Sequence, residues 1–144
     1  RKRIERLVFE KGLRDHVLFL GIREDIPDLL QAFDLMLFPS FHEGLPVTII
    51  EAQAAGLPCI LSDQITREVD LGIQLIRHAR LVEIDEWLNN IRYFAKKDAD
   101  RKVLERTLAD KGYDIRFTAE WMNKFYINLL NPLEERRDGG VRIS

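Results

Sequence analysis

The sequence predicts an α/β domain that is built on a doubly wound parallel sheet and followed by a helical C-terminal third. Short, continuously apolar runs alternate with segments of helical periodicity as far as Ile84, and no strand pattern follows that residue. Continuous apolar runs are typical of strands buried on both faces, and strands that alternate with helices form parallel sheets. The 144 residues allow one domain with a real core, but not two.

The first part of the chain begins with a helix and a strand. Apolar residues at helical spacing predict a helix over residues 4–13, closed by Gly12 near its C-terminus. The apolar run at residues 17–20 predicts a strand buried on both faces. Asp25 then caps a short helix that carries Pro27 near its first turn.

The middle of the chain continues the alternation. Residues 35–38 and 58–61 are apolar and predict two more buried strands. Between them, Pro46 begins a helix that Gly56 ends. Residues 73–76 predict a weaker fourth strand.

The last part of the chain is helical. Residues 85–97, 101–111 and 115–130 carry helical periodicity, and we expect these helices to pack on one side of the sheet. The polar stretch at residues 131–144 predicts a tail with little order. Residues 1–130 therefore form the expected domain.

Composition excludes several classes of protein. A formal net charge of −2 argues against a nucleic-acid partner, because phosphate-backbone affinity needs a basic surface. No apolar run approaches the roughly 20 residues of a membrane span, and the basic start lacks the apolar segment of a signal peptide. The single cysteine, Cys59, lies in an apolar strand pattern and predicts a buried structural thiol. We expect a cytoplasmic protein.

Two loops lie where a parallel sheet binds ligands, at the carboxyl ends of its strands. Residues 21–23 follow the first predicted strand, and residues 39–46 follow the second. In the second loop Gly44 lets the backbone approach a ligand, and Pro46 presets the helical φ of the next residues. The helix that begins there offers free N–H groups and partial positive charge, which suit a phosphate.

Two carboxylates flank this helix start. Glu43 lies in the loop and Glu51 on the second turn of the helix, and carboxylates accept hydrogen bonds from vicinal sugar hydroxyls. The arrangement indicates a sugar-phosphate ligand. The alternative is that both acids are solvated surface charges, that Gly44 serves only the turn, and that Arg23 is a solvated surface residue. Histidine, cysteine and acidic residues show no metal-ligand spacing.

These residues resemble the signature of the group 1 (family 4) glycosyltransferases, retaining enzymes of the GT-B fold. The string PSFHEGLP at residues 39–46 precedes EAQAAGLP at residues 51–58, with seven residues between the two glutamates. Residues 62–69 (SDQITREV) and 112–115 (GYDI) resemble the subgroup that builds exopolysaccharide and capsule. The resemblance covers about residues 4–130.

The resemblance implies roles for matching positions in the C-terminal, Rossmann-like donor-binding half of such an enzyme. Glu43 would bind the hydroxyls of the donor sugar close to the reacting carbon. Glu51 would hold the ribose hydroxyls. The remaining site residues would contribute mainly backbone groups: Gly21, Ile22 and Arg23 to the base, Gly44 and Leu45 to the sugar, and Pro46, Val47 and Thr48 to the start of the diphosphate-binding helix.

The resemblance also implies that parts of the family fold lie outside this chain. Its sheet has the order 3-2-1-4-5-6, and residues 17–20 match the third strand. The first two strands, their basic residues and the N-terminal acceptor-binding domain have no counterpart, so we expect a truncated domain that is inactive alone. Residues 17–20 should then pair directly with residues 35–38, or with a second chain in a strand-exchanged dimer. Residues 141–144 are a less favoured partner.

The expected function is therefore binding of a nucleotide-diphosphate sugar, a UDP-sugar, for retaining transfer to a hydroxyl acceptor in cell-surface polysaccharide synthesis. No cofactor and no metal are expected, and the full-length enzyme would associate peripherally with the inner face of the membrane. One alternative is a non-catalytic regulatory domain that binds sugar nucleotides. Another is a receiver-like domain, but Asp34 precedes its strand, the wrong end for phosphotransfer.

Overall fold

The computed structural model describes residues 1–97 and 105–138. The described residues form a sheet of three parallel strands, β1 (Met36–Phe38), β2 (Cys59–Ser62) and β3 (Ile76–Ala79), which lie side by side in chain order. Helices separate the strands along the chain, so the predicted α/β class is confirmed. The order also matches the second half of the sheet that the resemblance implies.

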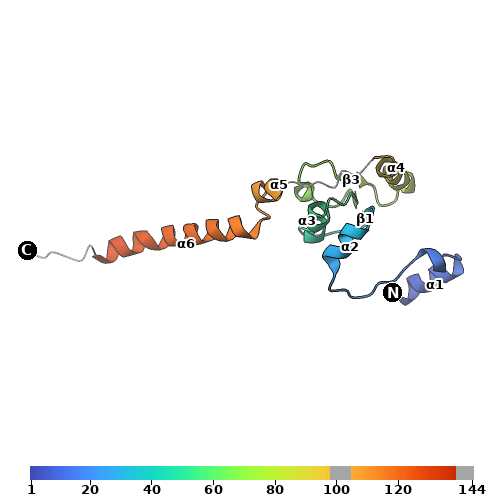
Figure 1. The fold of residues 1–144 in the computed structure, drawn as a ribbon, viewed down its shortest axis with the longest axis horizontal. Coiled ribbons are helices and arrows are strands. Elements are labelled where there is room, and N and C mark those ends of the chain that lie inside the picture. The colour runs from blue at the N-terminus through green and yellow to red at the C-terminus, as the bar shows by residue number, and fades with distance from the viewer. Residues whose placement is uncertain (98–104, 139–144) are drawn as a thin grey trace, which may run out of the picture.

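Helices cover both faces of this sheet. Alternate residues of β2 point to opposite sides: Cys59 and Leu61 belong to a core formed with α3 (Val47–Ala54), and Ile60 packs with Phe94 of α4 (Ile84–Ala95). Figure 1 shows α3 and α4 on opposite sides of the strands. The sheet is therefore doubly wound, as predicted, and β2 is its most buried strand.

The core on the α3 side is the larger one. It gathers apolar residues from α2 (Ile26–Ala32), α3, β2 and the segment around the short 3₁₀ helix η2 (Arg67–Val69). Burial of each large aliphatic side chain contributes about 1.5–3 kcal/mol to folding. Cys59 lies fully inside this core, and burial raises the pKa of its thiol to about 12. The prediction of a buried structural thiol is confirmed.

Two predicted details near the sheet are wrong. Asp25 stands at the N-cap of α2, but its side chain makes no capping bond and instead accepts hydrogen bonds from Arg23. The last strand begins at Ile76 rather than at residue 73, because Gly72 and Gln74 have positive φ values of 78° and 61°. Such left-handed residues form a turn and interrupt an extended strand.

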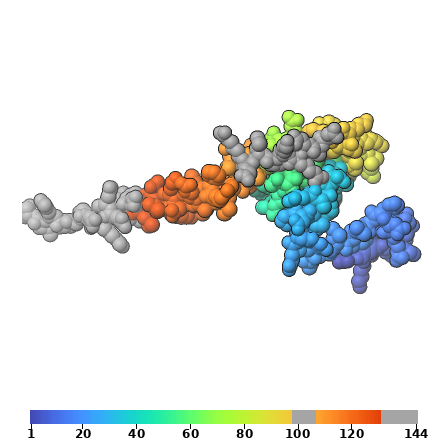
Figure 2. All heavy atoms as spheres, viewed as in Figure 1, coloured from blue at the N-terminus to red at the C-terminus, as the bar shows by residue number. Residues whose placement is uncertain are grey.

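The predicted strand at residues 17–20 does not form. Leu18 is 82% exposed, and no described residue makes a backbone hydrogen bond with residues 17–20. Pairing with β1 within the chain is therefore wrong. Figures 1 and 2 show the N-terminal segment, with α1 (Lys2–Glu10) and the 3₁₀ helix η1 (Arg14–His16), standing apart from the sheet. A strand needs a neighbour to satisfy its backbone groups, and this segment lies away from the free edge of β1.

The C-terminal helices are α5 (Glu105–Asp110) and α6 (Ile115–Asp138). Leu108 of α5 packs against the larger core, but α6 projects away from the sheet and leaves residues 119–130 exposed. The expected packing of the last helix on the sheet is wrong. The backbone remains helical through Asp138, where little order was expected, and residues 141–144 lie outside the described part. Within the described ranges, no helix has the length and apolar character to cross a membrane.

Candidate functional site

The loop between β1 and α3 leaves the sheet at the carboxyl end of β1 and carries Glu43. The side chain of Glu43 is exposed, and the Ser40 hydroxyl donates a hydrogen bond to its Oε1 at 2.8 Å. This bond restrains the carboxylate and leaves Oε2 without a partner among the described residues. Ser40 therefore positions Glu43, a role that the sequence alone did not indicate.

The conformation and packing of the chain do not require glycine at position 44. Its φ lies outside the left-handed region, and a Cβ built on it would meet no atom within 4 Å. Neither turn conformation nor crowding within the chain therefore demands glycine here. Open space in front of Gly44 is what a close approach of a ligand to the backbone requires.

The N-terminus of α3 presents unpaired amide groups beside this open space. The helix begins at Val47, one residue later than predicted, and Pro46 takes the N-cap position without a side-chain cap. No described residue accepts a hydrogen bond from the N–H groups of Gly44, Leu45, Val47 or Thr48. Free amides at the positive end of a helix form a binding place for an anion.

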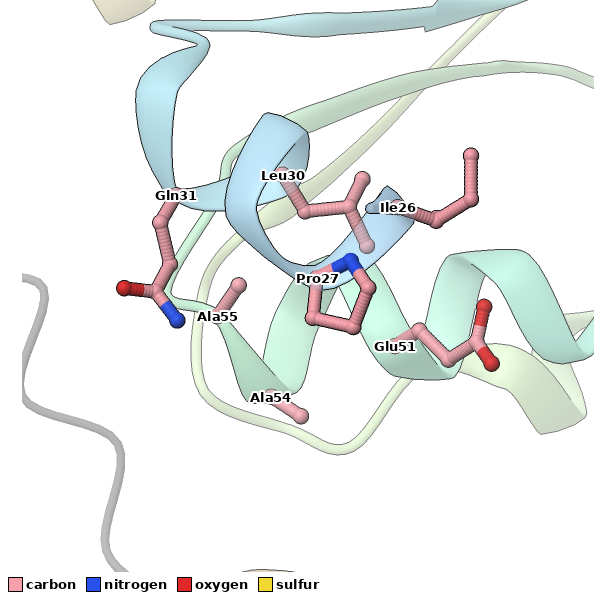
Figure 3. Close-up of a pocket in the computed structure, with 7 residues that line it drawn as sticks. All are labelled: Ile26, Pro27, Leu30, Gln31, Glu51, Ala54 and Ala55. Atoms are coloured by element: carbon pink, nitrogen blue, oxygen red, sulfur yellow. The ribbon is translucent and has the colours of Figure 1, made fainter. Parts of the chain in front are cut away.

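Glu51 lines a cavity between α2 and α3. The cavity has a volume of about 320 Å³ and is lined by Ile26, Pro27, Leu30, Gln31, Glu51, Ala54 and Ala55. Figure 3 shows Leu30 and Ile26 of α2 on one side, Glu51 and Ala54 of α3 on the other, and Pro27 between them. Apart from Gln31 and Glu51, the walls are apolar. Glu43 is not among the lining residues, so the expectation that both acids contact one sugar-phosphate ligand stays a prediction.

The loop at residues 21–23 leads into the helix that forms one wall of this cavity. Gly21 has a φ of 71°, and Ile22 is fully exposed. Arg23 donates from Nε to Asp25 Oδ1 at 2.7 Å and from Nη2 to Asp25 Oδ2. This guanidinium holds the pKa of the Asp25 carboxyl below its ordinary value. Because Asp25 occupies the guanidinium, Arg23 would serve a ligand through its backbone.

Gln53 anchors the helix that carries Glu51, and sequence reasoning missed it. This fully buried side chain donates to Val69 O at 2.7 Å and to Ile49 O at 3.1 Å, and it accepts from Leu71 N–H at 3.1 Å. These bonds tie α3 to the segment around η2. The available signal was a polar residue on the otherwise apolar face of the predicted helix.

The described residues contain no group of three or more histidine, cysteine, aspartate or glutamate side chains that could hold a metal ion. The groups assembled around α3 are carboxylates, unpaired amides and an apolar cavity. This set suits an anionic ligand that also carries hydroxyl groups and an apolar ring.

Comparison with known proteins finds similarity to glycosyltransferases. A family model described as "Glycosyl transferases group 1" matches residues 1–96. EpsF of Bacillus subtilis (strain 168), named as a glycosyltransferase, is 45% identical over 113 residues, which are 77% of this chain and 29% of EpsF.

Two further relatives match shorter segments. A UDP-Gal:alpha-D-GlcNAc-diphosphoundecaprenol alpha-1,3-galactosyltransferase of Escherichia coli is 48% identical over 38% of this chain and 14% of that protein. The lipopolysaccharide glucosyltransferase WaaG of Escherichia coli (strain K12) is 36% identical over 41% of this chain and 16% of WaaG. The matched region is thus less than a third of each of these three relatives.

Proposed function

The chain belongs to the group 1 glycosyl transferase family, and we propose that it forms the part of a retaining glycosyltransferase that binds a nucleotide-diphosphate sugar. The observation that carries the proposal is the start of α3, where unpaired amides lie between Glu43 and Glu51 in the sequence. The relative WaaG, named as a lipopolysaccharide glucosyltransferase, supports a role in polysaccharide synthesis.

The diphosphate would bind at the N-terminus of α3. The N–H groups of Val47 and Thr48 are free to donate, and the helix dipole adds favourable potential for negative charge. The negative charge of a diphosphate complements the partial positive charge at this end of the helix. The amides of Gly44 and Leu45 would meet the adjacent sugar, since nothing within the chain fills the space in front of Gly44.

Glu51 would hold the ribose, and the cavity beside it would receive the adjoining part of the nucleoside. A carboxylate accepts hydrogen bonds from both hydroxyls of a vicinal diol. The apolar walls from α2 and α3 suit a flat ring. The backbone of Ile22 and Arg23 would border the base. The word UDP-Gal in the name of the Escherichia coli galactosyltransferase favours a uridine nucleotide.

Glu43 would bind the hydroxyls of the donor sugar beside the reacting carbon. Its bond to Ser40 restrains one oxygen, which lowers the entropy lost when the other oxygen engages a ligand. The contribution of these residues to catalysis would be orientation of the sugar and stabilisation of the departing diphosphate.

Calorimetric titration of the chain with UDP, GDP and ADP tests the binding site. We expect UDP to bind, and Glu51→Ala to weaken its binding by about 1–3 kcal/mol through loss of a charged hydrogen bond. The control is Glu120→Ala on α6, whose carboxylate pairs with Lys124 and should leave UDP affinity unchanged. Equal affinities for the two variants would contradict the proposed role of Glu51.

A kinetic series separates the roles of the two acids in a polypeptide that joins this chain to an acceptor-binding domain. Glu43→Ala should mainly lower kcat, because its partner is the sugar at the reacting centre. Glu51→Ala should mainly raise KM for the donor. The reverse pattern would show that the two roles are exchanged.

A further inference from the structure

The loop at residues 21–23 has few bonds that hold its backbone in one conformation. It makes no backbone hydrogen bond with a described residue, and Ile22 is fully exposed. Gly21 adds freedom, because glycine adopts many backbone conformations besides the left-handed one that it has here. A loop of this kind loses conformational entropy when its backbone meets a ligand, and that loss weakens binding.

A side-chain ion pair connects this loop to the start of α2. Arg23 donates from Nε to Asp25 Oδ1 at 2.7 Å and from Nη2 to Asp25 Oδ2. Two parallel bonds between two planar groups fix the orientation of the guanidinium as well as its distance from the carboxylate. The pair lies next to the cavity between α2 and α3, because Ile26 and Pro27, which follow Asp25, line that cavity.

The sequence around the start of α2 explains why the Asp25 carboxylate is available for Arg23. The side chain of an N-cap aspartate usually accepts a hydrogen bond from the N–H of the second or third residue of its helix. In α2 the second residue is Pro27, which has no N–H, and Asp25 makes no capping bond. The carboxylate of Asp25 therefore pairs with the loop instead of with the helix.

The Arg23–Asp25 pair contributes little to the stability of the fold. The two side chains are 42% and 39% exposed, and water screens an ion pair that is exposed to this degree. The pair also joins residues only two positions apart, so it connects no distant parts of the chain. Its main effect is local, since it restricts the conformations of residues 21–23.

We propose that Asp25 is a positioning residue for nucleotide binding, because through Arg23 it holds the backbone of residues 21–23 in the conformation that meets the base. Asp25 acts through Arg23 and does not itself contact the ligand. The pair is already formed in the ligand-free chain, so part of the entropy of the loop is lost during folding rather than on binding. The inference rests on the proposed function, in which this loop borders the base.

The first measurement needs no ligand. Amide ¹⁵N relaxation of the whole chain reports the fast backbone motion of Ile22 and Arg23, which should increase in Asp25→Asn. Asparagine keeps the size and the capping preference of aspartate, but it removes the negative charge and one of the two acceptor oxygens. Asp28→Asn is the matched control on the first turn of α2, because Asp28 makes no hydrogen bond or ion pair with a described residue.

Calorimetric titration with UDP and with inorganic pyrophosphate then separates the loop from the rest of the site. Asp25→Asn should weaken UDP binding about fivefold, because the loop must be ordered on binding. It should leave the affinity for pyrophosphate unchanged, since pyrophosphate would meet only the start of α3. Arg23→Ala should weaken UDP binding equally, and the double variant no further, because each change removes the same pair. Asp28→Asn should bind both ligands like the parent chain.

The outcomes separate this inference from the proposed function. Unchanged loop motion or unchanged UDP affinity in Asp25→Asn would overturn the positioning role and leave the donor site supported. Equal weakening of UDP and pyrophosphate would also overturn it, because a general loss of structure then explains the effect. A parent chain that binds neither UDP nor pyrophosphate would contradict the proposed function itself, and the positioning role with it.

Discussion

Two apolar runs of four residues have opposite fates in this molecule. Residues 17–20 read Val-Leu-Phe-Leu, and β2 (Cys59–Ser62) reads Cys-Ile-Leu-Ser. The first is the more apolar by composition, yet Leu18 is 82% exposed and the run pairs with no described strand. The second lies between β1 and β3, and all four of its residues are fully buried.

The difference teaches that apolar character permits burial but does not produce it. β2 has hydrogen-bonding neighbours on both edges, with α3 on one face and α4 on the other. Residues 17–20 have neither in the described chain, so their side chains gain nothing from adopting a strand. Stability should therefore be concentrated around β2, and four predictions test this contrast.

The largest effect is expected in the buried run. Leu61→Ala should lower the free energy of unfolding by about 2–5 kcal/mol, because it removes a fully buried side chain and leaves a cavity. Leu18→Ala should change it by less than about 0.5 kcal/mol. Urea unfolding followed by fluorescence of Trp87, which packs on the smaller core, measures both in a Trp121→Phe background. Similar losses for the two variants would show that residues 17–20 are buried in solution.

Removing the buried polar side chain of Gln53 from the same core should cause a smaller loss in the free energy of unfolding. Gln53→Ala leaves Val69 O and Leu71 N–H buried without their partner, which costs about 1–3 kcal/mol. The same urea experiment measures this loss. Asn123→Ala, at an exposed position of α6, is the control and should be within about 0.5 kcal/mol of the parent chain. An unchanged midpoint for Gln53→Ala would contradict the anchoring role.

The dependence of stability on pH should reveal the contribution of His78, which lies on β3. Burial, and then the positive charge of Arg67, lower the pKa of His78 below its ordinary 6.5, although Asp70 and Asp63 oppose this shift. The folded state thus favours the neutral ring. The stability linked to the neutral His78 ring is fully present above pH 6.5. It is lost as the pH falls from 6.5 through the lower folded pKa, because His78 of the unfolded chain takes up a proton first.

Thermal unfolding at a series of pH values checks this expectation. The Tm should fall below pH 6.5 in the parent chain and stay flatter in His78→Gln, which cannot be protonated. The pKa of Asp25 is lowered by Arg23, so the stability linked to that carboxylate is lost only at more acid pH, through its folded pKa. Identical profiles for the two proteins between pH 6.5 and the acid limb would contradict the contribution of His78.

The smallest effect on folding is expected from charges placed in the exposed run. Leu18→Lys combined with Leu20→Lys should leave the free energy of unfolding within about 0.5 kcal/mol of the parent chain. If this run pairs with a second chain, as the exchanged-dimer hypothesis holds, the parent should self-associate and the double variant should remain monomeric. Sedimentation velocity over a range of concentrations measures this.

The control for self-association is another exposed apolar surface, on α6. Leu129→Lys with Leu130→Lys changes α6 and leaves residues 17–20 intact. Loss of association in this variant alone would contradict exchange through residues 17–20. A parent chain that is monomeric at every concentration would contradict it as well.

The central part of the fold and of the candidate site was predictable because its signals are local. The apolar runs that became β1 and β2 are separated by one short helix, and Pro46 and Gly56 mark the ends of that helix in the sequence. The same loop–helix pattern predicted that Glu43 and Glu51 flank the start of α3. Family membership, carried by these same residues, is shown by the matching family model.

Other features were decided only by tertiary structure. The exposure of residues 17–20, the projection of α6 and the cavity between α2 and α3 depend on what lies next to each segment in space. The same holds for Ser40 and Gln53, whose partners Glu43, Val69 and Leu71 hold the loop and the helix of the site in place. Periodicity along the chain determines which face of an element is apolar. Whether that face is buried depends on partners that are distant in the sequence, because hydrogen bonding and exclusion of water need a second surface.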